Sequence, residues 1–447
     1  MAKIYKVKYL IILVTLGSLF SSCFQKDSDH DGLVDEKDQC PLIGAKSKNG
    51  CPVPKEMDEI HLYLDNSASM GGYFSESTEY KTIVSDLAVT MEKEIKPISI
   101  SFIADNIIFY PKDAQQFTSD IATTRIADQN SSQLHLMIQK IVSNSKANDV
   151  SLLISDCILS FPDSAIKANP EINKTDAEGV LKNNIYSTFA DLKRKDIATS
   201  IYAFQSNFTG TYYNYQNTHV PLKSQLRPFY VWVIAQKDIL KLFDAKMKEI
   251  SSFKPVQELH IGLVDSAVRQ YHILPQLGRG GHWKKIASPL AAGDKGLQDI
   301  ELIKTEPLFF NAVVNLDGLP AYAKDLVYLK KNLQLTSPGC KATFTVKPKS
   351  EVNSDKIKST DQRISFEGAT HVIEIRVNEL RLPGTAIQLT LPLKYDTWYK
   401  EWSSTDDKQV SQQGHQTFAF NYLIDGVKQA YETRNKNFIS LTFNLNK

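Results

Sequence analysis

The sequence lacks the patterns that mark zinc sites, thiol redox chemistry and common hydrolases. Its five cysteines include no Cys-x-x-Cys pair, which leaves zinc-ribbon and thioredoxin-like folds without support. The nine histidines are scattered singly and form no His-Glu-x-x-His, and neither Ser67 nor Ser69 lies in a Gly-x-Ser-x-Gly turn. These absences argue against a zinc protease or a serine hydrolase.

Strong charge of one sign and long apolar runs are also missing. The 52 basic and 50 acidic residues leave a net charge of +2, which provides no field suited to nucleic acid. After residue 19 no stretch approaches the roughly 18 apolar residues of a membrane-spanning helix. There is no internal repeat. A chain of 447 residues that is 42% hydrophobic suits two domains preceded by a short segment.

The N-terminus predicts export and a lipid anchor. Lys3, Lys6 and Lys8 form a basic region, and residues 10–19 form an apolar run too short to span a membrane. Leu-Phe-Ser-Ser-Cys at residues 19–23 resembles a bacterial lipobox, which implies a signal peptide over residues 1–22 and a lipid on Cys23. An ordinary signal peptide with an incidental cysteine is the alternative. The acidic residues that follow resemble the export signal of Bacteroidetes-type lipoproteins. We therefore expect a cell-envelope protein on the outer membrane, facing either the periplasm or the cell surface.

An acidic segment follows Cys23. Five aspartates occupy positions one, three, five, nine and twelve of a loop with Gly32 at position six: Asp27, Asp29, Asp31, Asp35 and Asp38. Alternating carboxylates can turn toward one cation, as in an EF-hand, but there is no room for the helix that precedes an EF-hand loop. A solvated acidic linker is the other alternative. With Cys-Pro at 40–41 and Gly-Cys-Pro at 50–52, the segment resembles a thrombospondin type 3 repeat. That resemblance implies calcium binding and a disulfide between Cys40 and Cys51. We call residues 23–55 the stalk.

The two remaining cysteines lie far apart in the chain. Cys157 is inside the apolar run Ser-Leu-Leu-Ile-Ser-Asp-Cys-Ile-Leu, so a buried free thiol is expected there. A disulfide from Cys157 to Cys340 would require the two halves of the chain to touch at those positions.

Strand and helix patterns alternate from residue 59 to about 252. Strands are expected at 60–64, 97–104, 107–110, 150–155, 198–204 and 229–235, and helices at 80–95, 131–142, 179–195 and 237–250. This order predicts an α/β domain, a doubly wound and mostly parallel sheet of Rossmann type with helices on both faces.

Oxygen-bearing side chains follow the first strand. His-Leu-Tyr-Leu-Asp-Asn-Ser-Ala-Ser places Asp65, Ser67 and Ser69 where ligands lie in open α/β sheets. A carboxylate with two hydroxyls suits a hard divalent cation, whereas a Ser/Asn/Gly turn that merely ends a strand is the alternative. The Asp-x-Ser-x-Ser pattern resembles the metal-ion-dependent adhesion site of von Willebrand factor A domains. The resemblance implies Mg²⁺, or Mn²⁺ in its place, and a protein or glycan ligand that completes the metal shell.

Two further metal ligands are implied by this resemblance. Asp156, at the end of the strand 150–155, supplies the second aspartate. The threonine of the family has no exact match: Ser132 aligns best, and Thr123 or Thr124 could serve instead. The two glycines that normally precede that threonine are missing, so a degenerate site on a retained fold is an open alternative.

The C-terminal half, residues 253–447, reads as mostly β. Period-two patterns at 342–346, 371–377, 386–391, 417–420 and 438–443 predict a sandwich-like domain, interrupted by one helix at about 423–433. The aromatic residues of Thr-Trp-Tyr-Lys-Glu-Trp at 397–402 either bind a partner or, as we favour, pack against a sheet.

The sequence as a whole favours a non-catalytic, membrane-anchored binding or adhesion module with a calcium-binding stalk. One alternative is a structural envelope scaffold without a working metal site. Another is a Mg²⁺-dependent phosphoryl-transfer hydrolase with Asp65 as nucleophile, but such enzymes normally carry a second carboxylate two residues on, and position 67 is serine.

Overall fold

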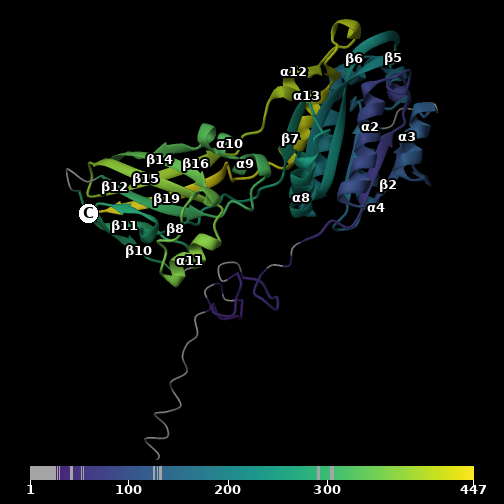
Figure 1. Ribbon diagram of the computed structural model, residues 1–447. Helices are drawn as coiled ribbons and strands as arrows, with labels where there is room; N and C mark the ends of the chain where they lie inside the picture. The colour runs from purple at the N-terminus through teal and green to yellow at the C-terminus, as the bar shows by residue number, and fades with distance from the viewer. Residues whose placement is uncertain are drawn as a thin grey trace, which may run out of the picture.

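The computed structural model describes residues 27, 29, 31–40, 44–51, 53, 55–123, 126–127, 129, 133–288, 292–302 and 307–447. These residues form an α/β lobe, a second lobe built mainly of strands, and the stalk that leads into them (Figure 1). The predicted lipid-bearing Cys23 lies outside the described residues. No helix within the described ranges is both long enough and apolar enough to cross a bilayer.

The α/β lobe is built on a seven-stranded sheet in the order β3-β2-β1-β4-β6-β5-β7. Its strands are β1 (Ile60–Asp65), β2 (Ile98–Ile103), β3 (Ile107–Tyr110), β4 (Val150–Ser155), β5 (Ile197–Tyr213), β6 (His219–Gln236) and β7 (Gln257–Ile261). Its helices are α2 (Glu79–Thr90), α3 (Ala114–Thr123), α4 (Leu134–Asn144), α5 (Asp163–Ala168), α6 (Ile172–Asp176), α7 (Lys182–Arg194) and α8 (Lys237–Glu249).

The direction of the strands refines the predicted mostly parallel sheet. β1 pairs in parallel with β2 on one side and with β4 on the other. The remaining neighbours, β2–β3, β4–β6, β5–β6 and β5–β7, pair antiparallel, and β2–β3 and β5–β6 are hairpins without a helical crossover. The parallel centre therefore consists of β2, β1 and β4, and the predicted metal ligands follow the carboxyl ends of β1 and β4.

Both faces of the sheet are covered, as the alternating pattern predicted. Successive strand residues point to opposite faces: Leu62 and Leu64 of β1 join one core with α2, α3 and α8, whereas Tyr63 joins the other with α4 and α7. All residues of β4 are buried, which explains why its sequence is apolar except for two small serines. Cys157 is buried as a free thiol, as expected, and so is Cys340.

The second lobe contains two mainly antiparallel sheets that share one hydrophobic core. The first sheet has the order β10-β11-β19-β16-β13, and the second has the order β14-β15-β12-β8, with β9 paired to β12. The strands are β8 (His272–Ile273), β9 (Arg279–Gly280), β10 (His282–Ile286), β11 (Gly296–Glu301), β12 (Leu308–Val314), β13 (Gln334–Thr336), β14 (Cys340–Pro348), β15 (His371–Leu380), β16 (Gly384–Pro392) and β19 (Asn437–Asn446). Its helices are α9 (Ala321–Lys324), α10 (Leu326–Asn332) and α11 (Thr360–Glu367).

The boundary between the lobes differs from the predicted division at residue 252. β7 is the edge strand of the α/β sheet, and the chain later returns to that lobe through α12 (Trp398–Glu401), β17 (Ser403–Ser404), β18 (Thr417–Phe418) and α13 (Phe420–Ala430). Local periodicity reports which face of a segment is apolar but not which distant segment covers it. The predicted packing of the aromatic residues at 397–402 is confirmed, since Trp398, Tyr399 and Trp402 are buried in the α/β core.

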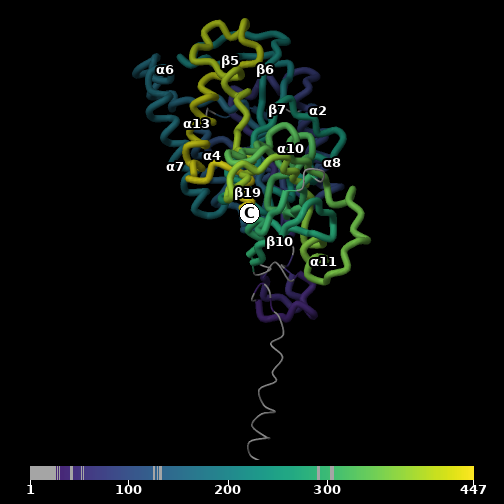
Figure 2. Tube along the Cα trace, turned by 90° about the vertical axis from the view of Figure 1, so that its left-hand side faces the viewer, coloured from purple at the N-terminus to yellow at the C-terminus, as the bar shows by residue number. Residues whose placement is uncertain are grey.

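Helix α13 lies beside α7 although the two are far apart in the chain (Figure 2). A Cβ at Gly426 would come within 2.8 Å of the Lys182 carbonyl oxygen and 3.1 Å of the Ile185 side chain. Glycine is therefore needed for this close approach. The Lys193 ammonium donates to the carbonyl of Glu432 at 2.9 Å and so ties the end of α7 to the chain beyond α13.

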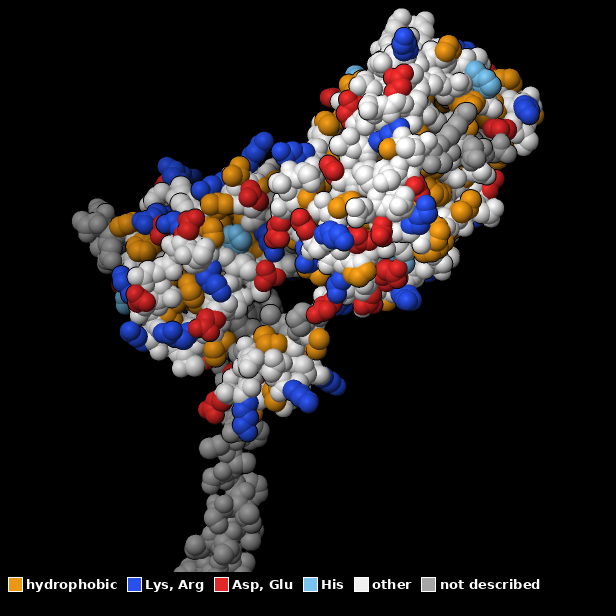
Figure 3. Space-filling model, turned by 45° about the vertical axis from the view of Figure 1, so that its right-hand side comes forward, with side chains coloured by type: hydrophobic (Ala, Val, Ile, Leu, Met, Phe, Trp, Pro, Cys, Tyr) orange, Lys and Arg blue, Asp and Glu red, His pale blue; other side chains and the backbone are white. Residues whose placement is uncertain are grey.

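Charged side chains are interspersed over both lobes (Figure 3). Lys and Arg lie among Asp and Glu on the face shown, in line with the near balance of charge in the sequence.

Candidate metal centre

The predicted ligands Asp65 and Asp156 follow neighbouring strands. β1 and β4 run parallel with Leu64 opposite Ile154, so Asp65 and the Ser155–Asp156 pair leave the same edge of the sheet. Asp65 is 3% exposed and Asp156 is 6% exposed. The chain turns sharply after Asp65 into a short 3-10 helix at Ala68–Gly72, which directs Ser67 and Ser69 back toward the strand end. The structure therefore brings together four of the side chains that the sequence predicted.

Hydrogen bonds hold the Asp65 carboxylate in place. Its Oδ1 accepts from the Ser67 backbone N–H at 2.9 Å, and its Oδ2 accepts from the Ser155 hydroxyl at 2.7 Å. The hydroxyl oxygens of Ser67 and Ser69 are 3.1 Å apart, and the Ser69 hydroxyl also hydrogen-bonds Asp156. The result is a connected set of oxygen atoms, which is the donor chemistry that Mg²⁺ and Mn²⁺ prefer.

The two carboxylates are costly as anions without a cation. Burial raises the pKa of Asp65, against the lowering effect of its hydrogen bonds from Ser67 and Ser155. Burial, and then the neighbouring charge of Asp65, raise the pKa of Asp156 to about 7. A bound divalent cation would offset both effects, since it supplies positive charge where burial has removed water. The donor set and its charge therefore fit the predicted ion.

The segment before α4 was expected to supply the fifth ligand, and one of its described residues, Gln129, lies against the turn after β1. Gln129 pairs with Ser67: the Ala68 N–H donates to the Gln129 carbonyl at 2.8 Å, and the Gln129 N–H donates to the Asn66 carbonyl at 3.2 Å. Ser132 and Thr124 lie outside the described residues. Thr123 is exposed in the last turn of α3, where its hydroxyl donates to the Ser119 carbonyl. It does not line the cavity that contains Asp65 and Asp156.

The sequence analysis missed Ser155. Its hydroxyl donates to Asp65 rather than lying free, so it positions a ligand. Its position could have indicated this role, because Ser155 is a polar residue at the carboxyl end of a mostly apolar strand.

The site opens into a cavity of about 200 Å³. Asp65, Ser67, Ser69, Ser155 and Asp156 form one part of its wall. The tip of the β5–β6 hairpin and Phe418 of β18 form other parts. We call this space the metal-site cavity. The parts of the wall from the hairpin and from β18 could not be predicted, because the local sequence pattern of a segment does not show which distant segment it contacts.

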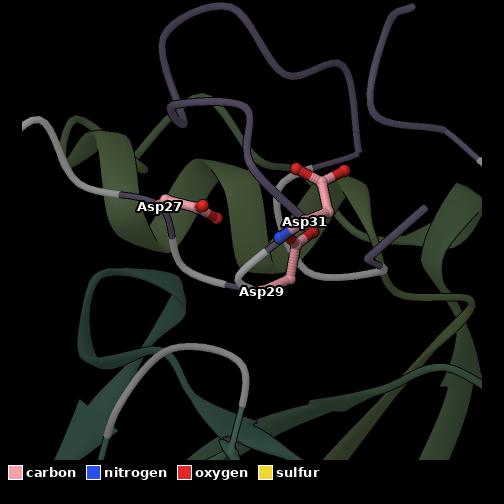
Figure 4. Close-up of side chains that lie close together, drawn as sticks. All are labelled: Asp27, Asp29 and Asp31. Carbon is pink, nitrogen blue, oxygen red and sulfur yellow. The ribbon is translucent and has the colours of Figure 1, made fainter. Parts of the chain in front are cut away.

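The stalk brings together three of its five predicted calcium ligands. Ligand atoms of Asp27, Asp29 and Asp31 all lie within 4.8 Å of one another, and Figure 4 shows the three side chains close together. Asp35 and Asp38 do not belong to this group in the described part of the stalk, although the charge of Asp38 contributes to raising the pKa of Asp29. The larger cause of that raised pKa is burial.

Two stalk carboxylates each have a buried oxygen that could coordinate calcium. Oδ2 of Asp29 and Oδ2 of Asp38 are buried and accept no hydrogen bond from the described residues. Buried acceptors of this kind normally have a partner, so calcium fits the donor set. The predicted disulfide between Cys40 and Cys51 is confirmed. The Gln39 N–H donates to the Asn49 carbonyl at 3.0 Å inside the loop that the disulfide closes.

Comparison with protein-family models, with curated proteins and with solved structures finds no match to this chain. The function is therefore inferred from the geometry of the two oxygen-rich sites.

Proposed function

We propose that the chain is a membrane-anchored lipoprotein of the bacterial cell envelope whose α/β lobe is a metal-dependent binding module. The observation that carries the proposal is the convergence of Asp65, Ser67, Ser69 and Asp156 at the carboxyl ends of two parallel strands. This is the arrangement that a von Willebrand factor A-like adhesion site requires, and the parallel centre of the sheet supports that resemblance.

Each residue has a distinct role in this proposal. Asp65 and Asp156 provide negative charge, and Ser155 and the Ser67 N–H fix the orientation of Asp65. Ser67 and Ser69 provide neutral oxygens. Mg²⁺ or Mn²⁺, when bound, supplies an electrophilic centre that an incoming carboxylate can complete. Since two of the ligands are neutral hydroxyls, the protein leaves the ion attractive to an anionic ligand.

The wall of the metal-site cavity supports binding rather than catalysis. His219 is the only histidine among the described residues that line it, and it is exposed at the hairpin. Phosphoryl transfer to Asp65 would need a second carboxylate as acid or base, and Ser67 stands where such enzymes usually carry one.

A thermal-shift titration tests the metal-dependent module. Millimolar Mg²⁺ or Mn²⁺ should raise the melting temperature of the wild-type chain but not of Asp65→Ala. Asp86→Ala serves as the control, because Asp86 is an exposed aspartate on α2, outside the cavity wall, and this variant should respond like wild type. An identical response of wild type and Asp65→Ala would contradict the proposal.

A fractionation experiment tests the anchor. Cys23→Ser should release the protein from membranes or block its processing, because the lipid is the only membrane attachment that the sequence predicts. Unchanged membrane association with normal processing would show that the lipobox assignment is wrong.

A further inference from the structure

The metal-site cavity has a polar part and an apolar part. Besides the oxygen-bearing residues, its wall includes five apolar side chains that are at most 4% exposed: Leu134, Met137, Leu159, Ile166 and Phe418. They come from α4, the loop after β4, α5 and β18. A metal site that serves only to hold an ion has no need of such a wall. The wall indicates that a ligand with an apolar part enters beside the ion.

We infer that the cavity binds a small organic acid, whose carboxylate completes the metal shell while its aliphatic or aromatic part contacts the apolar wall. This inference rests on the proposed function, because it assigns the ligand class of the same site.

The volume of the cavity limits the size of the ligand. A space of about 200 Å³ is below the ~300–1,000 Å³ of pockets that bind drug-sized molecules. At about 30 Å³ for each water-sized group, it holds roughly six or seven such groups. An acid of four to six carbons is about this size, whereas a folded protein surface cannot enter.

The walls are held in place without a ligand. Asp407 accepts from the Tyr212 hydroxyl at 2.7 Å and from the Tyr215 N–H at 2.9 Å, and all three residues are buried. The Tyr215 ring stacks on Phe418 with the ring centres 5.6 Å apart. These contacts fix the hairpin tip against the chain that returns from the second lobe. The cavity is therefore preformed, which lowers the entropic cost of binding a small ligand.

The mouth of the cavity is polar. Asp163 at the start of α5 and His219 at the hairpin are exposed lining residues, and Asn217 at the hairpin is partly exposed. The order from outside to inside is thus polar residues first and then buried apolar and metal-ligating residues. A compact acid that passes the mouth meets the apolar wall and the ion together.

Calorimetry with acids of increasing apolar size tests the inference. The full chain, saturated with Mg²⁺, is titrated with acetate, butyrate and methoxyacetate, the last of which replaces one methylene of butyrate by oxygen. Each buried methylene should tighten binding by about fourfold, so butyrate, which has two more methylenes, should bind roughly 16-fold more tightly than acetate. Methoxyacetate should lose most of that gain.

A matched pair of variants locates the effect. Ile158 is a partly exposed residue of the cavity wall, and Ile158→Asn should reduce the preference for butyrate while the response to Mg²⁺ is kept. Ile108→Asn makes the same change at a half-exposed position of β3, outside the cavity wall, and should behave like wild type.

The outcomes separate this inference from the proposed function. If Mg²⁺ does not raise the melting temperature of the wild-type chain, both the proposed function and this inference are overturned. Mg²⁺ binding with equal affinities for acetate and butyrate would overturn the inference alone. So would tighter binding of an aspartate-containing peptide than of butyrate, because the ligand would then be a protein segment rather than a free acid.

Discussion

The two oxygen-rich sites of this chain are ordered by different means. In the stalk, Asp27, Asp29 and Asp31 project from a segment whose described residues contain no helix or strand, and a disulfide with a few backbone hydrogen bonds orders the loop. In the α/β lobe, Asp65 and Asp156 follow strands at the centre of a seven-stranded sheet between two hydrophobic cores. We therefore expect the stalk to need calcium, in addition to its disulfide, for full order, and the lobe to need Mg²⁺ for binding only.

This comparison predicts its largest effect when calcium is removed. Chelation with EGTA should raise the rate of proteolytic cleavage within the stalk by up to about 100-fold relative to calcium at ~100 times its Kd, since the ion stabilises the ordered loop by mass action. The two lobes should remain intact. Limited proteolysis followed by mass spectrometry measures both.

A single substitution should reproduce this effect. Asp31→Asn removes one carboxylate from the group of three and should leave the stalk open to cleavage even with calcium. Equal cleavage rates with calcium and with EGTA in wild type would show that the disulfide alone orders the stalk.

The metal site of the lobe should lose affinity without loss of fold. Asp65→Asn removes the charge but keeps an oxygen that can still accept from Ser155. We expect Mg²⁺ affinity to fall by about 100-fold or more, and the free energy of unfolding in EDTA to stay equal or rise, because two buried carboxylates no longer repel each other. Chemical denaturation with and without Mg²⁺ measures both quantities. A variant that fails to fold would contradict the view that the sheet, and not the ion, orders this site.

The smallest expected change, when it is counted for each pH unit, is in the pH dependence of stability. The pKa of Asp156 is about 7 in the folded chain against an ordinary value of 3.8, so the folded state binds this proton more tightly than the unfolded state does. In EDTA the free energy of unfolding should therefore fall as pH rises from about 4 to 7, by at most ~1.4 kcal/mol per pH unit. Asp156→Asn should remove this slope.

Saturating Mg²⁺ should flatten the same curve, because the cation then offsets the charge of Asp156. Above about pH 7 the carboxylate is ionised in both states and no further loss from this group is expected. A curve in EDTA that rises between pH 4 and 7, with Asp156→Asn unchanged from wild type, would contradict the assignment.

The sequence located the site better than it located the walls around it. Asp65, Ser67 and Ser69 were predicted because they follow a strand that is visible in the local pattern. Asp156 was implied by the resemblance to the adhesion site, and it too follows a visible strand. The alternating pattern likewise predicted an α/β lobe followed by strands, and the Cys40–Cys51 disulfide was implied by the resemblance of the stalk to a thrombospondin type 3 repeat.

Contacts between distant segments were not predictable. Phe418 and α13 were assigned to the second half of the chain because their own pattern shows only that they are apolar. Helix α7, which packs against α13, lies more than 200 residues earlier in the chain. The need for glycine at position 426 becomes evident only when the two helices are seen in contact. The long β5–β6 hairpin was predicted as two shorter strands, since the polar residues near its tip hide the extension that covers the metal site.

The most direct test of the account is anomalous diffraction from crystals of the chain soaked in Mn²⁺. We expect a peak bounded by the oxygens of Asp65, Ser67, Ser69 and Asp156, at the distance of direct metal–oxygen ligands. Crystals of Asp65→Ala treated in the same way should show no peak at that position. Wild-type crystals without a peak there, while Mn²⁺ is bound elsewhere on the chain, would contradict the central claim.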